Sequence, residues 1–349
     1  MDKALKEKLF NGEIPKGCKY CIKGEKLVLF VTGLCSRNCF YCPISEVKKN
    51  KDIAWANERK INYLNDLIEE AKSMKAEGCG ITGGDPLLKI EKTCRYIRAL
   101  KNKFGKKFHI HLYNSLGNQF NEINLRKLEN SGLDELRVHP DLFNNKYWDR
   151  IILARKFKFK IGVEIPVIPK KENETINIVE FFKDKVDFFN LNELESSELN
   201  INYYIRNNLM LKDNLSYAIK GSEELSKKIV KNYPGLNIHY CSSSFKDKIQ
   251  FGRRILRTAK NTRNKFDIVT KDGMLKRGAI YADNLKSLNS FMNKLRLNNL
   301  YIDKKNSRIL TSIKTINKLK GVLKKQGFKP AIVEEYPTYD GLQVSMEFI

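Results

Sequence analysis

Short apolar segments alternate with amphipathic helical segments through the first two-thirds of this 349-residue chain. The repeat is about 30 residues long, the length that a strand and its crossover helix need. Six such units predict a parallel sheet with crossover helices. Because six units are too few for a closed eight-stranded barrel, we expect an open partial (β/α)6 barrel. The predicted strands are 26–32, 79–82, 108–113, 133–138, 159–165 and 187–192, and the predicted helices are 57–77, 89–104, 122–130, 145–156 and 173–184.

The alternation ends after residue 192. Residues 198–232 are expected to be mostly helical, 236–241 to form another strand and 245–264 a basic helix. An Asp-Gly pair at 272–273 then predicts a hairpin. Helices at 284–297 and 312–326, with strands near 299–303, 307–311, 329–335 and 342–348, predict a small α+β domain. The expected parts are an N-terminal extension (1–22), a barrel with helical additions (23–265) and a C-terminal α+β module (266–349).

The cysteine content and the absence of targeting signals indicate the cellular compartment of the protein. No apolar run is long enough to cross a membrane, and the charged N-terminus has no apolar stretch of a secretory signal after it. We therefore predict a cytoplasmic protein. Five of the eight cysteines fall between residues 18 and 42. In a cytoplasmic chain, this clustering favours metal binding over disulfides.

Cys35, Cys39 and Cys42 follow the first predicted strand with the spacing Cys-x3-Cys-x2-Cys. Three thiolates on one short loop can bind three irons of a [4Fe–4S] cluster and leave the fourth iron open to another ligand. A zinc or redox-cysteine loop is the alternative, but zinc sites usually combine two Cys-x2-Cys pairs. An aromatic residue, Tyr41, precedes the third cysteine.

This loop resembles the Cys-x3-Cys-x-aromatic-Cys motif of the radical S-adenosylmethionine (SAM) superfamily. The resemblance implies that the open iron binds SAM and that the reduced cluster cleaves it to methionine and a 5′-deoxyadenosyl radical, which abstracts hydrogen from a substrate. It also implies an electron donor such as ferredoxin or flavodoxin. The chain further resembles an archaeal radical SAM family related to pyruvate formate-lyase activating enzyme, in the segments VLFVTGLCSRNCFYCP, NELE, HYCSSSFKD and EEYPTYDGL.

Gly83, Gly84 and Asp85 follow the second predicted strand. Members of the superfamily carry a Gly-Gly-Glu element there that binds the SAM amino group, and Asp85 is one methylene shorter than that Glu. A simple strand-to-helix turn is the alternative. The resemblance also implies that Tyr41 supports the adenine and that strand ends contact the SAM carboxylate and ribose. The expected contacts from strand ends are Asn114, Arg137 and Asn192.

Cys18, Cys21 and Cys241 form a possible second metal site. Three such thiols suit an auxiliary iron–sulfur cluster or, with His239 as a fourth ligand, zinc. The alternative is that the pair binds weakly or only packs, while Cys241 is a buried thiol.

The net charge of +25 indicates either a Lys-rich proteome or a polyanionic partner. Guanidinium groups on the predicted basic helix suit phosphate, so we predict an RNA substrate, most naturally tRNA. A protein substrate, as in activating enzymes, and a non-catalytic iron–sulfur or SAM-binding regulator are the alternatives. The expected RNA contacts are Arg253, Arg254, Arg257 and Lys260.

Overall fold

The computed structural model describes residues 10–214, 216–295, 297 and 299–349 and divides the chain into two compact units. The first comprises Met1–Lys72 and Ala76–Phe251, and the second comprises Ser73–Lys75 and Gly252–Ile349. This division differs from the expected one, because helix α11 (Gly252–Thr262) groups with the second unit. Residues 1–9 of the expected N-terminal extension lie outside the described residues.

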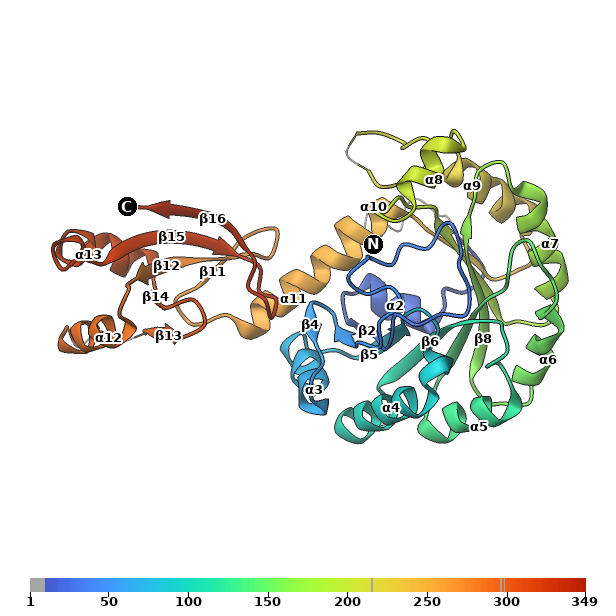
Figure 1. The fold of residues 1–349 in the computed structure, drawn as a ribbon, viewed down its shortest axis with the longest axis horizontal. Helices are drawn as coiled ribbons and strands as arrows, with labels where there is room; N and C mark the ends of the chain where they lie inside the picture. The colour runs from blue at the N-terminus through green and yellow to red at the C-terminus, as the bar shows by residue number, and fades with distance from the viewer. Residues whose placement is uncertain (1–9, 215, 296, 298) are drawn as a thin grey trace. The chain divides into compact units, whose positions relative to one another are not determined.

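The first unit is built on a curved sheet whose core is seven parallel strands in the order β10-β9-β8-β7-β6-β5-β2 (Figure 1). Strand β2 and strand β10 do not pair with each other among the described residues, so the predicted open partial barrel is confirmed. The seventh parallel strand is the segment predicted at 236–241, which joins the sheet beside β9. The strands are β2 (Lys26–Phe30), β5 (Gly78–Thr82), β6 (His109–Ser115), β7 (Glu135–His139), β8 (Lys160–Val167), β9 (Phe188–Glu193) and β10 (Ile238–Cys241).

Short antiparallel strands extend both ends of this sheet. Strand β1 (Phe10–Asn11) pairs with β10, and β3 (Trp55–Ala56) pairs with β2 and with β4 (Arg59–Lys60). The first residues of the helix predicted at 57–77 instead form part of the hairpin of β3 and β4. The observed helix begins only at Leu64. The crossover helices are α3 (Leu64–Ser73), α4 (Ile90–Phe104), α5 (Glu122–Ser131), α6 (Ile151–Ala154), α7 (Glu172–Phe182) and α9 (Ser222–Asn232).

Two other predicted helices are interrupted. Among the described residues between 198 and 232, only α8 (Ile201–Arg206) and α9 are helical, and Leu211 pairs with Ile219 in an isolated antiparallel bridge. The predicted helix 245–264 is divided into α10 (Ser243–Phe245), a π-helical segment η3 (Lys246–Phe251) and α11. No helix in the described part of the chain is long and apolar enough to cross a membrane.

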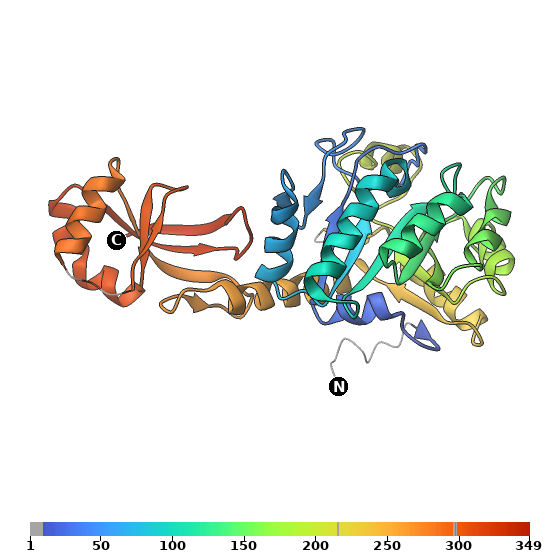
Figure 2. The same ribbon diagram turned by 90° about the horizontal axis from the view of Figure 1, so that it is seen from below.

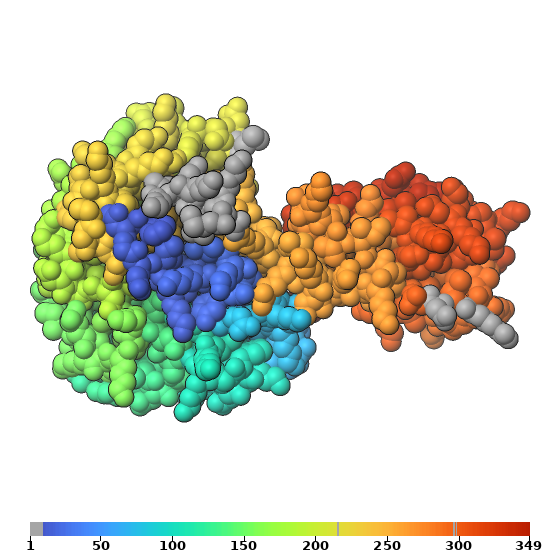
Figure 3. Space-filling view, turned by 180° about the vertical axis from the view of Figure 1, so that it is seen from behind, coloured from blue at the N-terminus to red at the C-terminus, as the bar shows by residue number. Residues whose placement is uncertain are grey.

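Polar side chains occupy one face of the parallel sheet. Alternate residues of a strand point to opposite faces, and the register aligns Tyr113 with Arg137 and Glu164 with Asn190. Helix α2 (Lys16–Ile22) lies against this interior, and the amide of Gly17 donates to the Glu135 carboxylate at 3.3 Å. Figure 3 shows the segment containing α2, in dark blue, near the middle of one face of the first unit. The barrel interior is therefore polar and is covered at this end by α2.

The second unit has the order β-α-β-β-α-β, with all neighbouring strands antiparallel. Its sheet order, β13-β14-β12-β15, is that of a ferredoxin-like split βαβ fold, and β16 is added at the edge. Helices α12 and α13 pack on one face of this sheet around Ile280 and Ile309 (Figure 2). The elements are β11 (Ile268–Val269), β12 (Leu275–Tyr281), α12 (Leu285–Lys294), β13 (Tyr301–Asp303), β14 (Arg308–Thr311), α13 (Ile313–Lys325), β15 (Lys329–Glu335) and β16 (Gln343–Phe348).

Candidate active site

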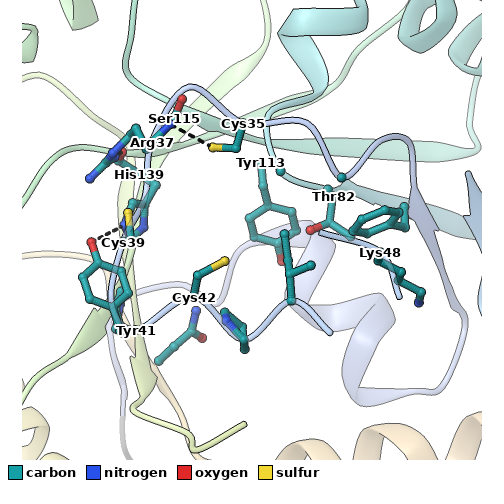
Figure 4. A pocket seen from close by; sticks show the side chains of 18 of the residues that line it. Cys35, Arg37, Cys39, Tyr41, Cys42, Lys48, Thr82, Tyr113, Ser115 and His139 are labelled. Carbon is teal, nitrogen blue, oxygen red and sulfur yellow. Dashed lines mark hydrogen bonds between the residues drawn. The ribbon is translucent and has the colours of Figure 1, made fainter. Parts of the chain in front are cut away.

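A cavity of about 630 Å³ lies at the carboxyl ends of the parallel strands of the first unit (Figure 4). All three cysteines of the loop after β2 line it, together with residues that end β5, β6, β8 and β9. The carboxyl end of a parallel sheet is where ligands bind in α/β folds, because the strand-to-helix loops gather there. Of the predicted site residues, the lining includes Cys35, Cys39, Cys42, Tyr41, Gly83, Gly84, Asn114 and Asn192.

The cysteine loop is attached to the end of β7. Arg37 donates from Nη1 to the carbonyl of His139 at 2.7 Å and pairs with Asp141 at 3.2 Å. His139 Nδ1 lies 2.9 Å from the carbonyl of Glu164 and must donate to it, so Nε2 accepts from the Tyr41 hydroxyl at 3.0 Å. Burial lowers the pKa of His139 to about 4, which keeps this ring neutral. These bonds fix the position of Tyr41 between the second and third cysteines.

The turn after β5 is pressed against the same loop. The amide of Gly84 donates to the carbonyl of Thr32 at 2.7 Å, and the amide of Asp85 donates to the carbonyl of Leu34 at 2.7 Å. A Cβ on Gly84 would lie 2.3 Å from the oxygen of Leu34, and one on Gly83 would lie 2.5 Å from that of Thr32. The two glycines are therefore required for close approach of the turn to the cysteine loop.

Asp85 does not line the cavity. Its side chain is 1% exposed, and its carboxylate accepts from Ser115 Oγ at 2.5 Å, Asn114 Nδ2 at 2.8 Å and the amide of Leu87 at 3.0 Å. Burial raises the pKa of this carboxyl even though those hydrogen bonds lower it in part. Asp85 thus caps the 3-10 helix η1 (Pro86–Lys89) and orients Asn114 and Ser115, which do line the cavity.

Arg137 is also beneath the cavity and is not part of its lining. The guanidinium is 1% exposed and pairs with Glu135 at 2.5 Å and with Glu164 at 2.7 Å. Burial alone would raise the pKa of Glu164, but Arg137 and the Asn192 amide, which donates at 2.9 Å, lower it overall. Arg137 therefore positions Glu164, which lines the cavity beside Asn192.

The residues present suit a cluster and a polar ligand. All three loop cysteines are free thiols, and burial raises the pKa of Cys35 and Cys39, so metal would have to displace protons from them. In the same wall, the buried Oδ1 of Asn114 has no hydrogen-bond partner among the described residues. A buried acceptor left without a partner is costly, and a donor group on a bound ligand would satisfy it.

The described residues contain no group of three His, Cys, Asp or Glu side chains arranged to hold a metal ion. A cluster spaces its thiolate ligands farther apart than a single ion does, because sulfides bridge its irons. For Cys18, Cys21 and Cys241, the second site stays a prediction. Arg137 Nη2 lies 3.4 Å from Cys18 Sγ, and Gln250 donates to Cys241 Sγ at 3.5 Å. Burial raises the pKa of Cys18 to about 11 and that of Cys241 to about 12, so both are protonated thiols here.

Sequence reasoning missed one charged pair in the cavity wall. Lys246 Nζ lies 2.9 Å from the carboxylate of Glu195, and both residues line the cavity. Lys246 falls in the segment predicted as a basic helix (245–264), but it begins the π-helical segment that follows α10. Only the position of this lysine a few residues after a predicted strand could have indicated its place in the wall.

Comparison with known proteins decides the family. The chain is 41% identical over 346 residues to a protein of Methanocaldococcus jannaschii named “Putative glycyl-radical enzyme activating enzyme”, and the match covers 95% of this chain and 92% of that one. The sequence model of the Radical SAM superfamily matches residues 29–182. The chain belongs to the radical SAM superfamily. It is therefore an enzyme of this superfamily, which implies a [4Fe–4S] cluster and SAM.

Other comparisons are less informative. A domain of unknown function, DUF8061, matches residues 273–347. Streptococcus suis SuiB bound to SAM aligns with a TM-score of 0.44 and 11% identity, over 62% of this chain and 50% of SuiB. HydG, a maturase of the [FeFe]-hydrogenase, aligns with a TM-score of 0.41 and 12% identity, over 70% of this chain and 65% of HydG.

Proposed function

We propose that Cys35, Cys39 and Cys42 hold the [4Fe–4S] cluster and that the chain activates a protein partner by abstracting hydrogen from a glycine. The observation that carries the substrate class is the near full-length similarity to the Methanocaldococcus jannaschii protein, whose name describes a glycyl-radical enzyme activating enzyme. The cavity supports the cofactor assignment, because it brings the three thiols and the unpartnered Asn114 acceptor together.

The protein's own residues bind and orient SAM in this proposal. Asn114 Oδ1 and the backbone of Gly83 and Gly84 face the SAM amino group, and Asp85 acts as a positioning residue through Asn114 and Ser115. Tyr41, fixed by His139, lies on the adenine side, and Asn192 contributes a polar contact from β9. Arg137 is assigned a positioning role under Glu164, which replaces the direct SAM contact expected from its sequence position.

A [4Fe–4S] cluster held by Cys35, Cys39 and Cys42 would supply the electron that cleaves SAM to methionine and a 5′-deoxyadenosyl radical. Transfer of a hydrogen atom from the glycine Cα to that radical would give 5′-deoxyadenosine and a glycyl radical on the partner. One electron enters per turnover, and we expect it to come from a donor such as ferredoxin or flavodoxin.

The RNA substrate predicted from charge receives no support. Arg257 donates to the backbone carbonyl of Met74 at 2.9 Å and to that of Lys75 at 2.8 Å, and Arg254 is 9% exposed. These guanidinium groups stabilise the second unit rather than forming an open phosphate site.

Transfer of deuterium from glycine tests the substrate class. Protein extract from the source cells, grown on glycine deuterated at Cα, would be incubated without oxygen with the reconstituted enzyme, SAM and dithionite. We expect deuterium in the 5′-deoxyadenosine and an organic radical signal in electron paramagnetic resonance. Extract labelled at alanine Cα is the matched control. Unlabelled 5′-deoxyadenosine from the glycine extract would refute the glycine substrate while leaving SAM cleavage established.

A further inference from the structure

Helices α12 and α13 of the second unit carry lysines without any acidic residue. All seven lysine side chains are exposed, and none forms an ion pair among the described residues. We call this set the lysine face. It consists of Lys286, Lys294, Lys314, Lys318, Lys320, Lys324 and Lys325.

A lysine-rich composition alone does not explain the lysine face. In the described part of the first unit, every helix of eight or more residues contains Asp or Glu, and several of its lysines form ion pairs. Lys127, for example, pairs with Glu91 at 2.6 Å, and Lys183 pairs with Glu180 at 2.7 Å. The two units therefore differ in their acids: the long helices of the first unit all carry them, and α12 and α13 carry none.

The two helices present these lysines on one surface. Leu288 and Met292 of α12 share a buried core with Ile316 and Leu323 of α13, so both helices cover the same face of the sheet (Figure 2). The exposed lysines of both helices therefore lie on the side of the sheet that these helices cover. Clustered like charge of this kind attracts a polyanion over several ångströms.

We propose that the lysine face binds the phosphodiester backbone of a nucleic acid without reading its sequence. The other exposed side chains of the two helices are mainly short polar groups that donate to phosphate oxygens. They include no exposed aromatic side chain for stacking on unpaired bases, and Val322 is their one large exposed apolar residue. An acidic protein partner would need apolar anchors at the centre of its interface, which this surface lacks. The polar groups are Ser287, Ser290, Asn293 and Asn317.

Salt dependence of binding tests this proposal, which is independent of the proposed function and needs no cluster. The full chain would be titrated with fluorescent probes of mixed sequence: a DNA duplex, an RNA duplex and a single RNA strand. The triple variant Lys314→Gln/Lys318→Gln/Lys324→Gln removes three charges from the lysine face. The matched control, Lys72→Gln/Lys127→Gln/Lys183→Gln, removes three paired lysines from helices of the first unit.

We expect the affinity for the DNA duplex to fall steeply as salt rises, with a log–log slope that the lysine-face variant reduces by about 3 and the control leaves unchanged. The relative affinities of the three probes would show which nucleic acid is preferred. Failure to bind any probe at low salt would overturn the proposal, as would equal losses in the two triple variants. Displacement of the probes by polyglutamate at matched charge concentration would also overturn it, in favour of an acidic protein.

Discussion

The Asn114 amide donates to the Asp85 carboxylate at 2.8 Å, and this bond turns the opposite oxygen of Asn114 into the cavity wall without a partner. Asp85 therefore acts on the ligand through Asn114 and not by direct contact. The short acidic side chain is suited to this place, because its carboxylate also caps η1.

Asp85→Asn tests that relationship. Asparagine offers one acceptor oxygen where the carboxylate offers two, so Ser115 or Asn114 loses its partner. We expect the free energy of unfolding to fall by about 1–3 kcal/mol and SAM to bind about tenfold more weakly. Urea denaturation and equilibrium dialysis would measure both. The control is Asp184→Asn at an exposed position, and equal SAM affinity in the two variants would contradict the positioning role.

Gly84→Ala tests the contact between the turn and the cysteine loop. The added Cβ would meet the oxygen of Leu34 at 2.3 Å, so the loop has to move. We expect less iron per chain after reconstitution than in the wild type. Gly235→Ala is the control, because a Cβ there meets no atom within 4 Å. Full iron loading of Gly84→Ala would show that the close approach is not needed.

Arg137→Lys separates a positioning role from a SAM contact. Lysine keeps the charge but cannot bridge Glu135 and Glu164 with a planar fork, so we expect a loss of about 1–3 kcal/mol in the free energy of unfolding. SAM affinity should stay within about threefold of the wild type, because Arg137 does not line the cavity. The exposed Arg126→Lys is expected to change stability by less than about 0.5 kcal/mol. A large loss of SAM affinity at unchanged stability would instead indicate that Arg137 contacts SAM directly.

His109 makes stability depend on pH. Burial lowers its pKa to about 4, although Glu135 partly opposes the shift, whereas an unfolded histidine titrates near 6.5. Between these values the unfolded state binds more protons, so the wild type is expected to lose stability as the pH falls from about 6.5 to 4, by up to about 3 kcal/mol from this residue. His109→Gln should flatten that part of the profile in urea denaturation. If the free energy of unfolding of the variant depends on pH in the same way as that of the wild type, His109 is not the cause of the pH dependence.

The sequence predicted the parallel strands well because periodicity and strand ends are local features. The resemblance also implied that the cysteine loop and the Gly-Gly-Asp turn both serve SAM binding, and in the structure the two are in direct contact. The burial of the Asp85 and Arg137 side chains away from the cavity could not be predicted. A polar residue at a strand end has the same local sequence pattern whether it faces a cavity or a buried partner. The position of Lys246 depended on the π-helical turn, which has no local signal.

Anaerobic SAM cleavage by two triple variants tests the central claim most directly. One variant replaces Cys35, Cys39 and Cys42 with Ala, and the other replaces Cys18, Cys21 and Cys241. After reconstitution with iron and sulfide, dithionite and SAM are added and 5′-deoxyadenosine is measured. We predict that the wild type and the second variant form 5′-deoxyadenosine and that the first variant forms none. Formation of 5′-deoxyadenosine by the first variant at the wild-type rate would contradict the assignment of the cluster to this loop.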